Sequence, residues 1–140
     1  NRTEIMYAHG GGAYVYLCYG IHHLFNVVTH SKDVQHAILI RAIEPIEGIA
    51  EMLVRTRKKK ADYTLTKGPG NVAKALGIVT AHSGYSLRSK ELFIADDGFV
   101  VAAKQLRSTA RIGVDYAGDD ALLPYRFYLK DNLYVSGKLK

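Results

Sequence analysis

The sequence predicts an α+β fold, in which one mixed domain combines a mostly antiparallel β-sheet, a protruding β-hairpin and a few helices. Three observations predict it. Short segments rich in aromatic and β-branched residues recur along the chain between turn residues. Apolar residues at helical spacing follow a proline. Apolar residues also form 48% of the 140 residues, so a single domain can bury a core.

The first predicted element is a β-hairpin over residues 13–30. Tyrosine, valine, leucine and phenylalanine are dense here and are interrupted once, at Tyr19-Gly20. This is the pattern of two strands joined by a tight turn, with Tyr19 at or beside the tip. The apolar run 37–40 is short enough to predict a buried third strand within residues 36–42.

Two helices are predicted next. Pro45 begins a stretch that runs to about residue 60 and carries an apolar stripe at spacings of three and four: Ile46, Ile49, Leu53 and Val54. The basic end of this stretch, residues 55–60, favours a solvated helix C-terminus over a phosphate contact. A second, short helix is predicted at 72–76. The backbone amides of the preceding residues 67–71 either face an anion or only begin the helix.

Four strand-like segments follow Gly77, separated by turn signals such as Asp96-Asp97-Gly98. They are residues 92–95, 99–102, 110–114 and 125–129. No internal repeat, low-complexity tract or linker divides the chain. All of these elements are therefore expected in one domain.

Composition limits the classes of function. The formal net charge of +6 makes nucleic acid the leading partner class, although a merely solvated basic surface also explains it. The single cysteine, Cys18, excludes an intrachain disulfide and a cysteine-rich metal site, and fits an intracellular protein. No run approaches the roughly 18 apolar residues that cross a bilayer. The six histidines match no zinc spacing, so no metal is expected.

The densest candidate site is a group of three tyrosines in the predicted hairpin. Tyr14 and Tyr16 share one face of a strand because side chains alternate, whereas Tyr19 lies at the turn. A rigid aromatic at a hairpin tip enters a DNA minor groove, and a second aromatic stacks on an extruded base. Ordinary packing of tyrosines in a strand is the alternative.

Two polar residues lie among apolar neighbours. Asn26 follows Leu24-Phe25, where an amide either caps a local backbone group or contacts a base edge. Arg41 ends the apolar run, so we expect it to have a partner. That partner is either a structural carboxylate such as Glu44 or a group in an active site.

The order and spacing of several segments resemble the 3-methyladenine DNA glycosylase family. The segments are residues 14–20, 26–27 and 39–48, then Gly68-Pro69, Ala75-Leu76, 111–114, Ala117-Gly118, 126–128 and Val135-Ser136. Residues 1–6 are similar to the family's segment before the hairpin. The resemblance spans nearly the whole chain and thins between about residues 80 and 107. It implies one mixed α/β domain whose hairpin inserts into the DNA minor groove.

The resemblance implies roles for residues that contact DNA and the flipped base. Tyr19, with Gly20 beside it, resembles the aromatic that intercalates where the damaged nucleotide was, and Gly68 resembles a residue at the DNA surface. Tyr16 resembles one wall of the base pocket, with Tyr14 on the same strand face. Asn26 matches the pocket residue that disfavours the 2-amino group of guanine.

Two further residues match contacts to the nucleophilic water. Arg41 resembles the arginine beside that water, and the backbone carbonyl of Ile112 resembles a second contact. The implied reaction is hydrolysis of the N-glycosidic bond of alkylated or deaminated purines in base excision repair, with no cofactor. The implied partner is double-stranded DNA that contains damaged purines, bound by a monomer. The implied location is intracellular, the cytoplasm or nucleoid in a bacterium and the nucleus in a eukaryote.

One family feature does not occur in these residues. The family's general base is a glutamate in a Glu-Thr-Glu-Ala-Tyr segment, which the 140 residues lack. We therefore expect residues 1–140 to form the larger, C-terminal part of the glycosylase domain, without its N-terminal catalytic segment. A missing general base lowers the rate by roughly 10²- to 10⁴-fold. His22 and His23 also replace residues that are usually aromatic or apolar.

Two alternatives follow from that absence. The first is a module that recognises damaged or distorted DNA without cutting it. The second is a structural relative of formyltransferase C-terminal domains that binds RNA or a nucleotide, by analogy of fold alone.

Overall fold

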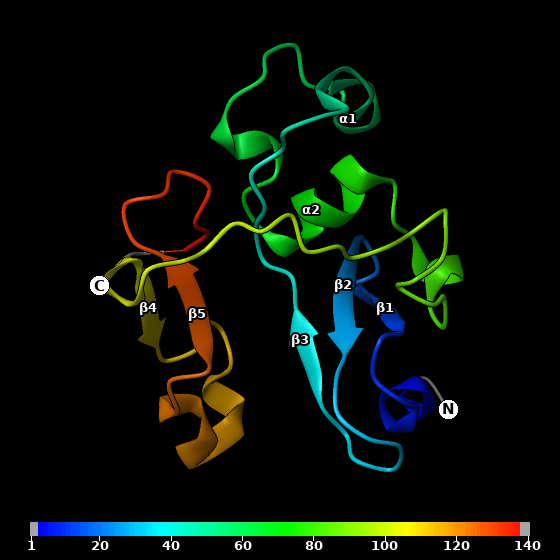
Figure 1. Ribbon diagram of the computed structural model, residues 1–140, viewed down its shortest axis with the longest axis vertical. Helices are drawn as coiled ribbons and strands as arrows, with labels where there is room; N and C mark the ends of the chain where they lie inside the picture. Colours follow the sequence, from blue (N-terminus) through cyan, green and yellow to red (C-terminus); the bar gives the residue numbers. More distant parts are fainter. Residues whose placement is uncertain (1–2, 138–140) are drawn as a thin grey trace.

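A computed structural model describes residues 3–137, so the first two residues of segment 1–6 lie outside it. It confirms a mixed α+β fold with two antiparallel sheets (Figure 1). The strands are β1 (Ala13–Cys18), β2 (His22–Val28), β3 (Ala37–Leu39), β4 (Leu106–Thr109) and β5 (Arg126–Leu129). The α-helices are α1 (Ile49–Thr56) and α2 (Pro69–Leu76). The 3₁₀-helices are η1 (Glu4–Tyr7), η2 (Tyr63–Leu65), η3 (Thr80–His82), η4 (Ala103–Gln105) and η5 (Asp115–Leu122).

The predicted hairpin is confirmed. Strands β1 and β2 pair antiparallel with Cys18 opposite His22, which leaves three turn residues between them. Tyr19 and Gly20 both have left-handed backbones, with φ of 51° and 71°, as tight hairpin turns require. Strand β3 adds to the other side of β2, with Leu39 opposite Asn26. The third strand is not buried as predicted, because Ile38 projects from this edge strand into solvent.

The main core lies on one face of the three-stranded sheet. Ala13, Val15 and Phe25 point to this face and pack against Ala73 of α2 and Ile78 just after it. Side chains alternate along a strand, so Tyr14, Tyr16 and Asn26 face the opposite way. A smaller cluster of Met52, Leu65 and Ala75 joins α1, η2 and α2.

The first helix is shorter than predicted and buries a different face. Gly48, in the left-handed region with φ of 71°, precedes α1, and Arg57 ends it in the same conformation. Because Gly48 interrupts the helical backbone, Pro45 does not begin the helix. Ile46 and Val54 are exposed, and Met52 and Thr56 are buried in their place. Helix α2 begins at Pro69, three residues earlier than predicted, since proline fits the first turn of a helix.

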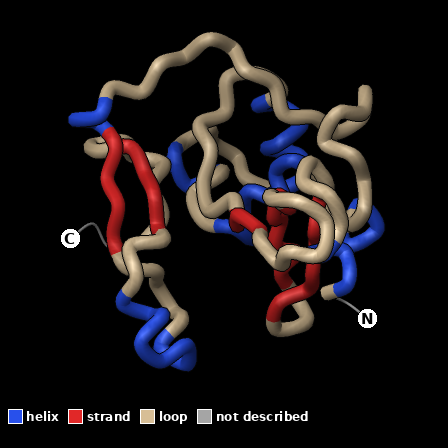
Figure 2. Tube along the Cα trace, turned by 60° about the horizontal axis from the view of Figure 1, so that its bottom comes forward, coloured by secondary structure: helices blue, strands red, loops and turns tan. Residues whose placement is uncertain are grey.

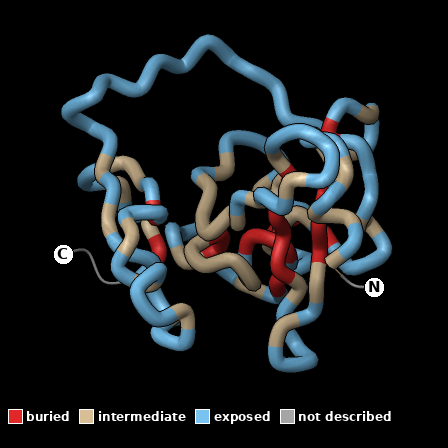
Figure 3. Tube along the Cα trace, turned by 90° about the horizontal axis from the view of Figure 1, so that it is seen from below, coloured by how far each residue is buried: buried red, intermediate tan, exposed pale blue. Residues whose placement is uncertain are grey.

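The second sheet contains only β4 and β5, and it stands apart from the first sheet (Figures 1 and 2). Of the four predicted strands, only 125–129 matches a strand, which is β5. Residues 92–95 form no more than an isolated bridge at Phe93. Residues 99–102 and 110–114 are loops, and β4 lies just before the latter. An exposed connection over residues 93–102 leads into this part of the molecule (Figure 3).

Among residues 3–137, every helix is too short or too polar to cross a membrane.

Candidate nucleic-acid interface and base pocket

The tip of the β1–β2 hairpin exposes two large side chains. Tyr19 is 92% exposed and Ile21 is also well exposed, whereas Leu24, Phe25 and Asn26 in the stem are buried. Figure 3 shows this tip as an exposed loop beyond buried strands. The turn accounts for the left-handed backbone of Tyr19, because the Ile21 amide donates to the Cys18 carbonyl across it. The side chain of Tyr19 itself packs little against the described chain and is exposed to solvent.

The start of α2 lies against the hairpin next to this tip. A Cβ atom built on Gly70 would come within 3.0 Å of the Nδ1 atom of His22, the first residue of β2. Gly68 precedes α2 with a φ of 103°, and a Cβ built there would meet no atom within 4 Å. The backbone at Gly68 is therefore open to close approach from outside, near the end of the hairpin that carries Tyr19.

Tyr14, Tyr16 and Asn26 lie together on the sheet face opposite the main core. The rings of Tyr14 and Tyr16 are 5.4 Å apart between centroids, and Tyr14 stands opposite Asn26 across the strands. The Asn26 amide nitrogen donates to the carbonyls of Tyr14, at 3.2 Å, and Leu24, at 3.3 Å. The backbone-capping role considered from the sequence is thus present. The Oδ1 atom of Asn26 takes no part in these two bonds.

Arg41 follows β3 and interacts electrostatically with Tyr16. Partial burial is the main cause that lowers the pKa of Arg41, the positive charge of Arg126 lowers it further, and Tyr16 opposes the shift. The Arg41 Nε atom is buried without a hydrogen-bond partner. Glu44, the structural partner considered from the sequence, accepts a 3.0 Å hydrogen bond from Asn132. Between residues 3 and 137, no carboxylate pairs with Arg41.

Ile112 comes from the second sheet region and lies close to Arg126. A Cβ atom built on Gly137 would come within 2.4 Å of Ile112 Cδ1 and 3.8 Å of Arg126 Nη2. In the part of the chain that the structure describes, the Ile112 carbonyl accepts no hydrogen bond from the protein. Arg126 in turn influences Arg41. Arg41 is thus linked electrostatically to Tyr16 and to Arg126, and Arg126 lies near Ile112.

Arg126 was not predicted as a site residue. Its side chain is only 7% exposed, and the sequence shows it merely as one arginine at the start of a strand-like segment. The one available signal was its place in the 126–128 segment that resembles the family. Burial and contacts that reach back to β4 and forward to Ser136 appear only in three dimensions.

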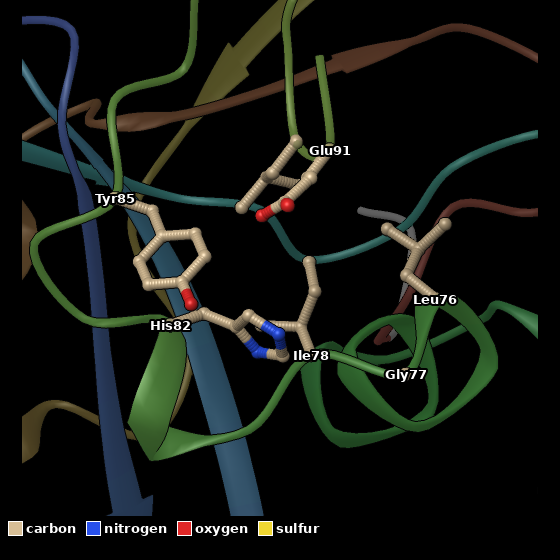
Figure 4. Close-up of a pocket in the computed structure, with 7 residues that line it drawn as sticks. Leu76, Gly77, Ile78, His82, Tyr85 and Glu91 are labelled. Atoms are coloured by element: carbon tan, nitrogen blue, oxygen red, sulfur yellow. The ribbon is translucent and has the colours of Figure 1, made fainter. Parts of the chain in front are cut away.

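A hollow of about 120 Å³ lies elsewhere, where His82, Tyr85 and Glu91 line it together with Leu76, Gly77, Ile78 and Leu92 (Figure 4). It contains none of the predicted site residues. Residues 3–137 hold no cluster of three His, Cys, Asp or Glu side chains able to bind a metal ion. The chemistry of the candidate site thus depends on tyrosine, asparagine, arginine and backbone groups.

Comparison with known proteins places the chain in a family. The description "Methylpurine-DNA glycosylase" applies to the family that matches residues 1–133. A protein of Bdellovibrio bacteriovorus, named "Putative 3-methyladenine DNA glycosylase", is 44% identical over 139 residues, which cover 98% of this chain and 69% of the relative. A Clostridium perfringens protein with the same name is 39% identical over 99% of this chain and 71% of its own length. A Bacillus cereus protein of that name is 42% identical over 99% of this chain and 71% of its own length. The chain therefore belongs to the methylpurine-DNA glycosylase family, the DNA repair family that the order and spacing of its sequence segments resemble.

Proposed function

We propose that this chain acts on duplex DNA carrying 3-methyladenine and related alkylated or deaminated purines. It extrudes the damaged nucleotide and hydrolyses its N-glycosidic bond, which is the first step of base excision repair. Its partner is double-stranded DNA that contains the lesion, which it engages as a monomer inside the cell. The net charge of +6 suits a polyanionic partner.

The observation that carries this proposal is the conformation of the hairpin tip. A tyrosine side chain that is 92% exposed at the tip of a tight turn gains little packing energy from the fold, but it gains stacking energy inside a duplex. Stacking of a base on an aromatic side chain contributes about 1–3 kcal/mol. Tyr19 therefore fills the space that the extruded nucleotide leaves, while Gly20 and Gly68 let the DNA backbone come close.

The flipped purine binds on the face formed by Tyr14, Tyr16 and Asn26. Tyr16 stacks on the base, and Tyr14 supports it through their ring contact. The nitrogen of Asn26 is occupied by backbone carbonyls, so its Oδ1 atom and its bulk are what a base meets. Purines alkylated at N3 or N7 are cationic and leave readily, so for them a shaped pocket and a positioned water are the main requirements.

The attacking water lies between Arg41 and the Ile112 carbonyl in our proposal. The Arg41 Nε atom has no protein partner and is free to donate, and the carbonyl of Ile112 is free to accept. No carboxylate pairs with Arg41 among residues 3–137. We therefore assign activation of the water to a glutamate outside the 140 residues, which contribute the flipping and pocket elements.

The test compares Tyr19→Ala with Tyr116→Ala on duplexes that carry one hypoxanthine or one 1,N6-ethenoadenine. Tyr116 is a matched control because it is 89% exposed yet lies in η5. Loss of stacking should weaken lesion binding by about 5- to 150-fold for Tyr19→Ala, and Tyr116→Ala should stay within about twofold. Equal preference of the wild type for lesion and intact duplex would refute the proposal.

A second candidate is a damaged-DNA-binding module without catalysis, which the exposed Tyr19 and the net charge of +6 support equally well. The reading frame upstream of Asn1 separates the two candidates. A Glu-Thr-Glu-Ala-Tyr-like segment there supports the enzyme, and its absence from a complete frame supports the module. The 140-residue polypeptide should bind the lesion duplex in a salt-sensitive way and release little or no base.

A further inference from the structure

Arg126 is a buried arginine that binds backbone and side-chain oxygens from two segments. Its Nη2 atom donates to the Ser136 carbonyl at 2.7 Å, and its Nη1 atom donates to Thr109 Oγ1 at 3.2 Å. Its guanidinium also stands over the ring of Tyr128, 4.5 Å from the centroid. Thr109 ends β4, and Ser136 lies beyond β5. Arg126 thus joins the end of β4, where the loop that contains Ile112 begins, to the segment that follows β5.

The segment that Arg126 binds also lies next to Ile112. Gly137 directly follows Ser136, and a Cβ atom built on it would come within 2.4 Å of Ile112 Cδ1. Real Cβ atoms do not approach so closely, so only glycine fits here without moving Ile112. The Gly137 backbone, with a φ of 83°, also suits glycine. The bond from Arg126 to Ser136 therefore holds Gly137 beside the end of the Ile112 side chain.

The positive charge of Arg126 also affects Arg41. It lowers the pKa of that side chain, which comes from the first sheet region. The described chain therefore holds two neighbouring cations here, and only Arg126 has its own hydrogen-bond acceptors. One buried side chain thus contacts the segment that confines Ile112 and stands near Arg41.

We propose that Arg126 is a positioning residue that holds the Ile112 carbonyl in place opposite the Arg41 guanidinium. It does so through Ser136 and Gly137 and does not touch the substrate. The inference rests on the proposed function for its catalytic meaning, because the water lies between Arg41 and Ile112 there. The geometric part, that Arg126 orders the Ile112 loop, stands independently of that function.

The geometric part is tested by amide hydrogen exchange with Arg126→Gln, Arg126→Lys and Arg107→Gln. Arg107, on β4, is the matched control because it too donates to backbone carbonyls, those of Lys104 and Leu106. Arg126→Gln should speed exchange at the hydrogen-bonded amides of Ala117 and Val135 by about 10-fold or more. It should leave the amides of β1 and β2 unchanged. Arg126→Lys should recover part of the protection, and Arg107→Gln should change none of it.

The catalytic part is tested by single-turnover release of the lesion base from a duplex, using the product of the complete reading frame. A misplaced carbonyl should slow release by about 10- to 100-fold for Arg126→Gln. Binding of the lesion duplex should stay within about twofold, because Arg126 does not contact DNA in this proposal. A drop in binding as large as the drop in release would overturn the positioning role.

Gly137→Ala keeps the proposal falsifiable even where Arg126→Gln fails to fold. The added methyl group displaces Ile112 and leaves the Arg126 guanidinium in place. It should reproduce the loss of release and the faster exchange at the Ala117 amide, which donates to the Val114 carbonyl. Normal release by Gly137→Ala, or exchange that rises equally across the whole chain with Arg126→Gln, would overturn the inference. If the wild type binds lesion and intact duplexes equally well but Arg126→Gln still speeds exchange locally, only the proposed function is refuted.

Discussion

Residues 13–87 and residues 88–137 are held together by different forces. Among residues 3–137, all the buried hydrophobic side chains lie between Ala13 and Leu87, where two clusters pack the three-stranded sheet against α1 and α2. Beyond Leu87 the buried side chains are those of Arg126 and Ser136, and both residues are polar. Hydrophobic burial therefore stabilises the first region, and directional polar contacts order the second.

The candidate site takes residues from both regions. Tyr14, Tyr16, Asn26 and Arg41 come from the first region, and Ile112 comes from the second. The bonds from Asn132 to Glu44 and from Lys67 to the Leu133 carbonyl join the two regions at exposed positions. The proposed stacking surface thus lies in the region that has a hydrophobic core. The Ile112 carbonyl, which is proposed to hold water, lies in the region that has fewer buried side chains.

The largest expected effect contrasts the two regions directly, through Phe25→Ala and Phe127→Ala. Phe25 is buried in the main core, and its loss should lower the free energy of unfolding by about 3–5 kcal/mol. Phe127, on β5, is mostly exposed, so its loss should cost no more than about 0.5 kcal/mol. Urea unfolding followed by circular dichroism measures both. Comparable losses for the two variants would show that the second region has a core of its own.

A smaller effect is expected from Asn26→Ala, with Asn132→Ala as its control. Asn26 is buried and bonds two carbonyls of its own hairpin, so truncation should cost about 1–3 kcal/mol of unfolding free energy. Asn132 bonds Glu44 at the surface, where a bond to a charged group is screened by solvent and should contribute about 0.5 kcal/mol or less. Denaturant titration again provides the measurement.

This pair also tests the role of Asn26 in base selection. Binding of lesion duplex must be compared where both variants are fully folded. If Asn26→Ala is as stable as the wild type, the two amide bonds contribute nothing to the hairpin. The reason for a buried Asn26 would then be contact with the base alone.

The sequence predicted the first sheet well because its signals are local. Alternating apolar residues specify the strands, and Tyr19-Gly20 specifies the turn, without reference to distant residues. The start of α1 was wrong because a left-handed Gly48 overrode the proline signal at Pro45. The strands predicted at 99–102 and 110–114 were wrong for another reason. Strand propensity depends on packing against a sheet, and the second region provides little to pack against.

The residues of the candidate site differ in how far local sequence patterns identify them. Tyr14, Tyr16 and Tyr19 share one strand and its turn, so period and position alone place them. Ile112 and Arg41 were matched by resemblance, since no local pattern relates residues 71 positions apart. Arg126 was missed because its importance arises from burial and from contacts with Thr109 and Ser136. Those contacts are products of the tertiary fold.

Arg41→Met is expected to change stability least. Among these variants it should also show the largest difference between its effect on stability and its effect on release of the lesion base. Burial and the nearby charge of Arg126 both disfavour the charged form and lower the pKa of Arg41. Exchange for an apolar chain of similar length should therefore leave the unfolding free energy unchanged or raise it by up to about 1 kcal/mol, allowing for partial exposure. Arg55→Met, which loses the bond to the Ala75 carbonyl, should lower it instead.

Release of the lesion base by Arg41→Met, in the product of the complete reading frame, should fall by about 10²-fold or more. A residue kept for packing shows the opposite combination, with lower stability and unchanged release. Such a result for Arg41→Met would place Arg41 with the structural residues of the first region. A variant that is stable and binds the lesion duplex, but no longer releases the lesion base, would instead show that the unfavourable charge of Arg41 is needed to hold the water.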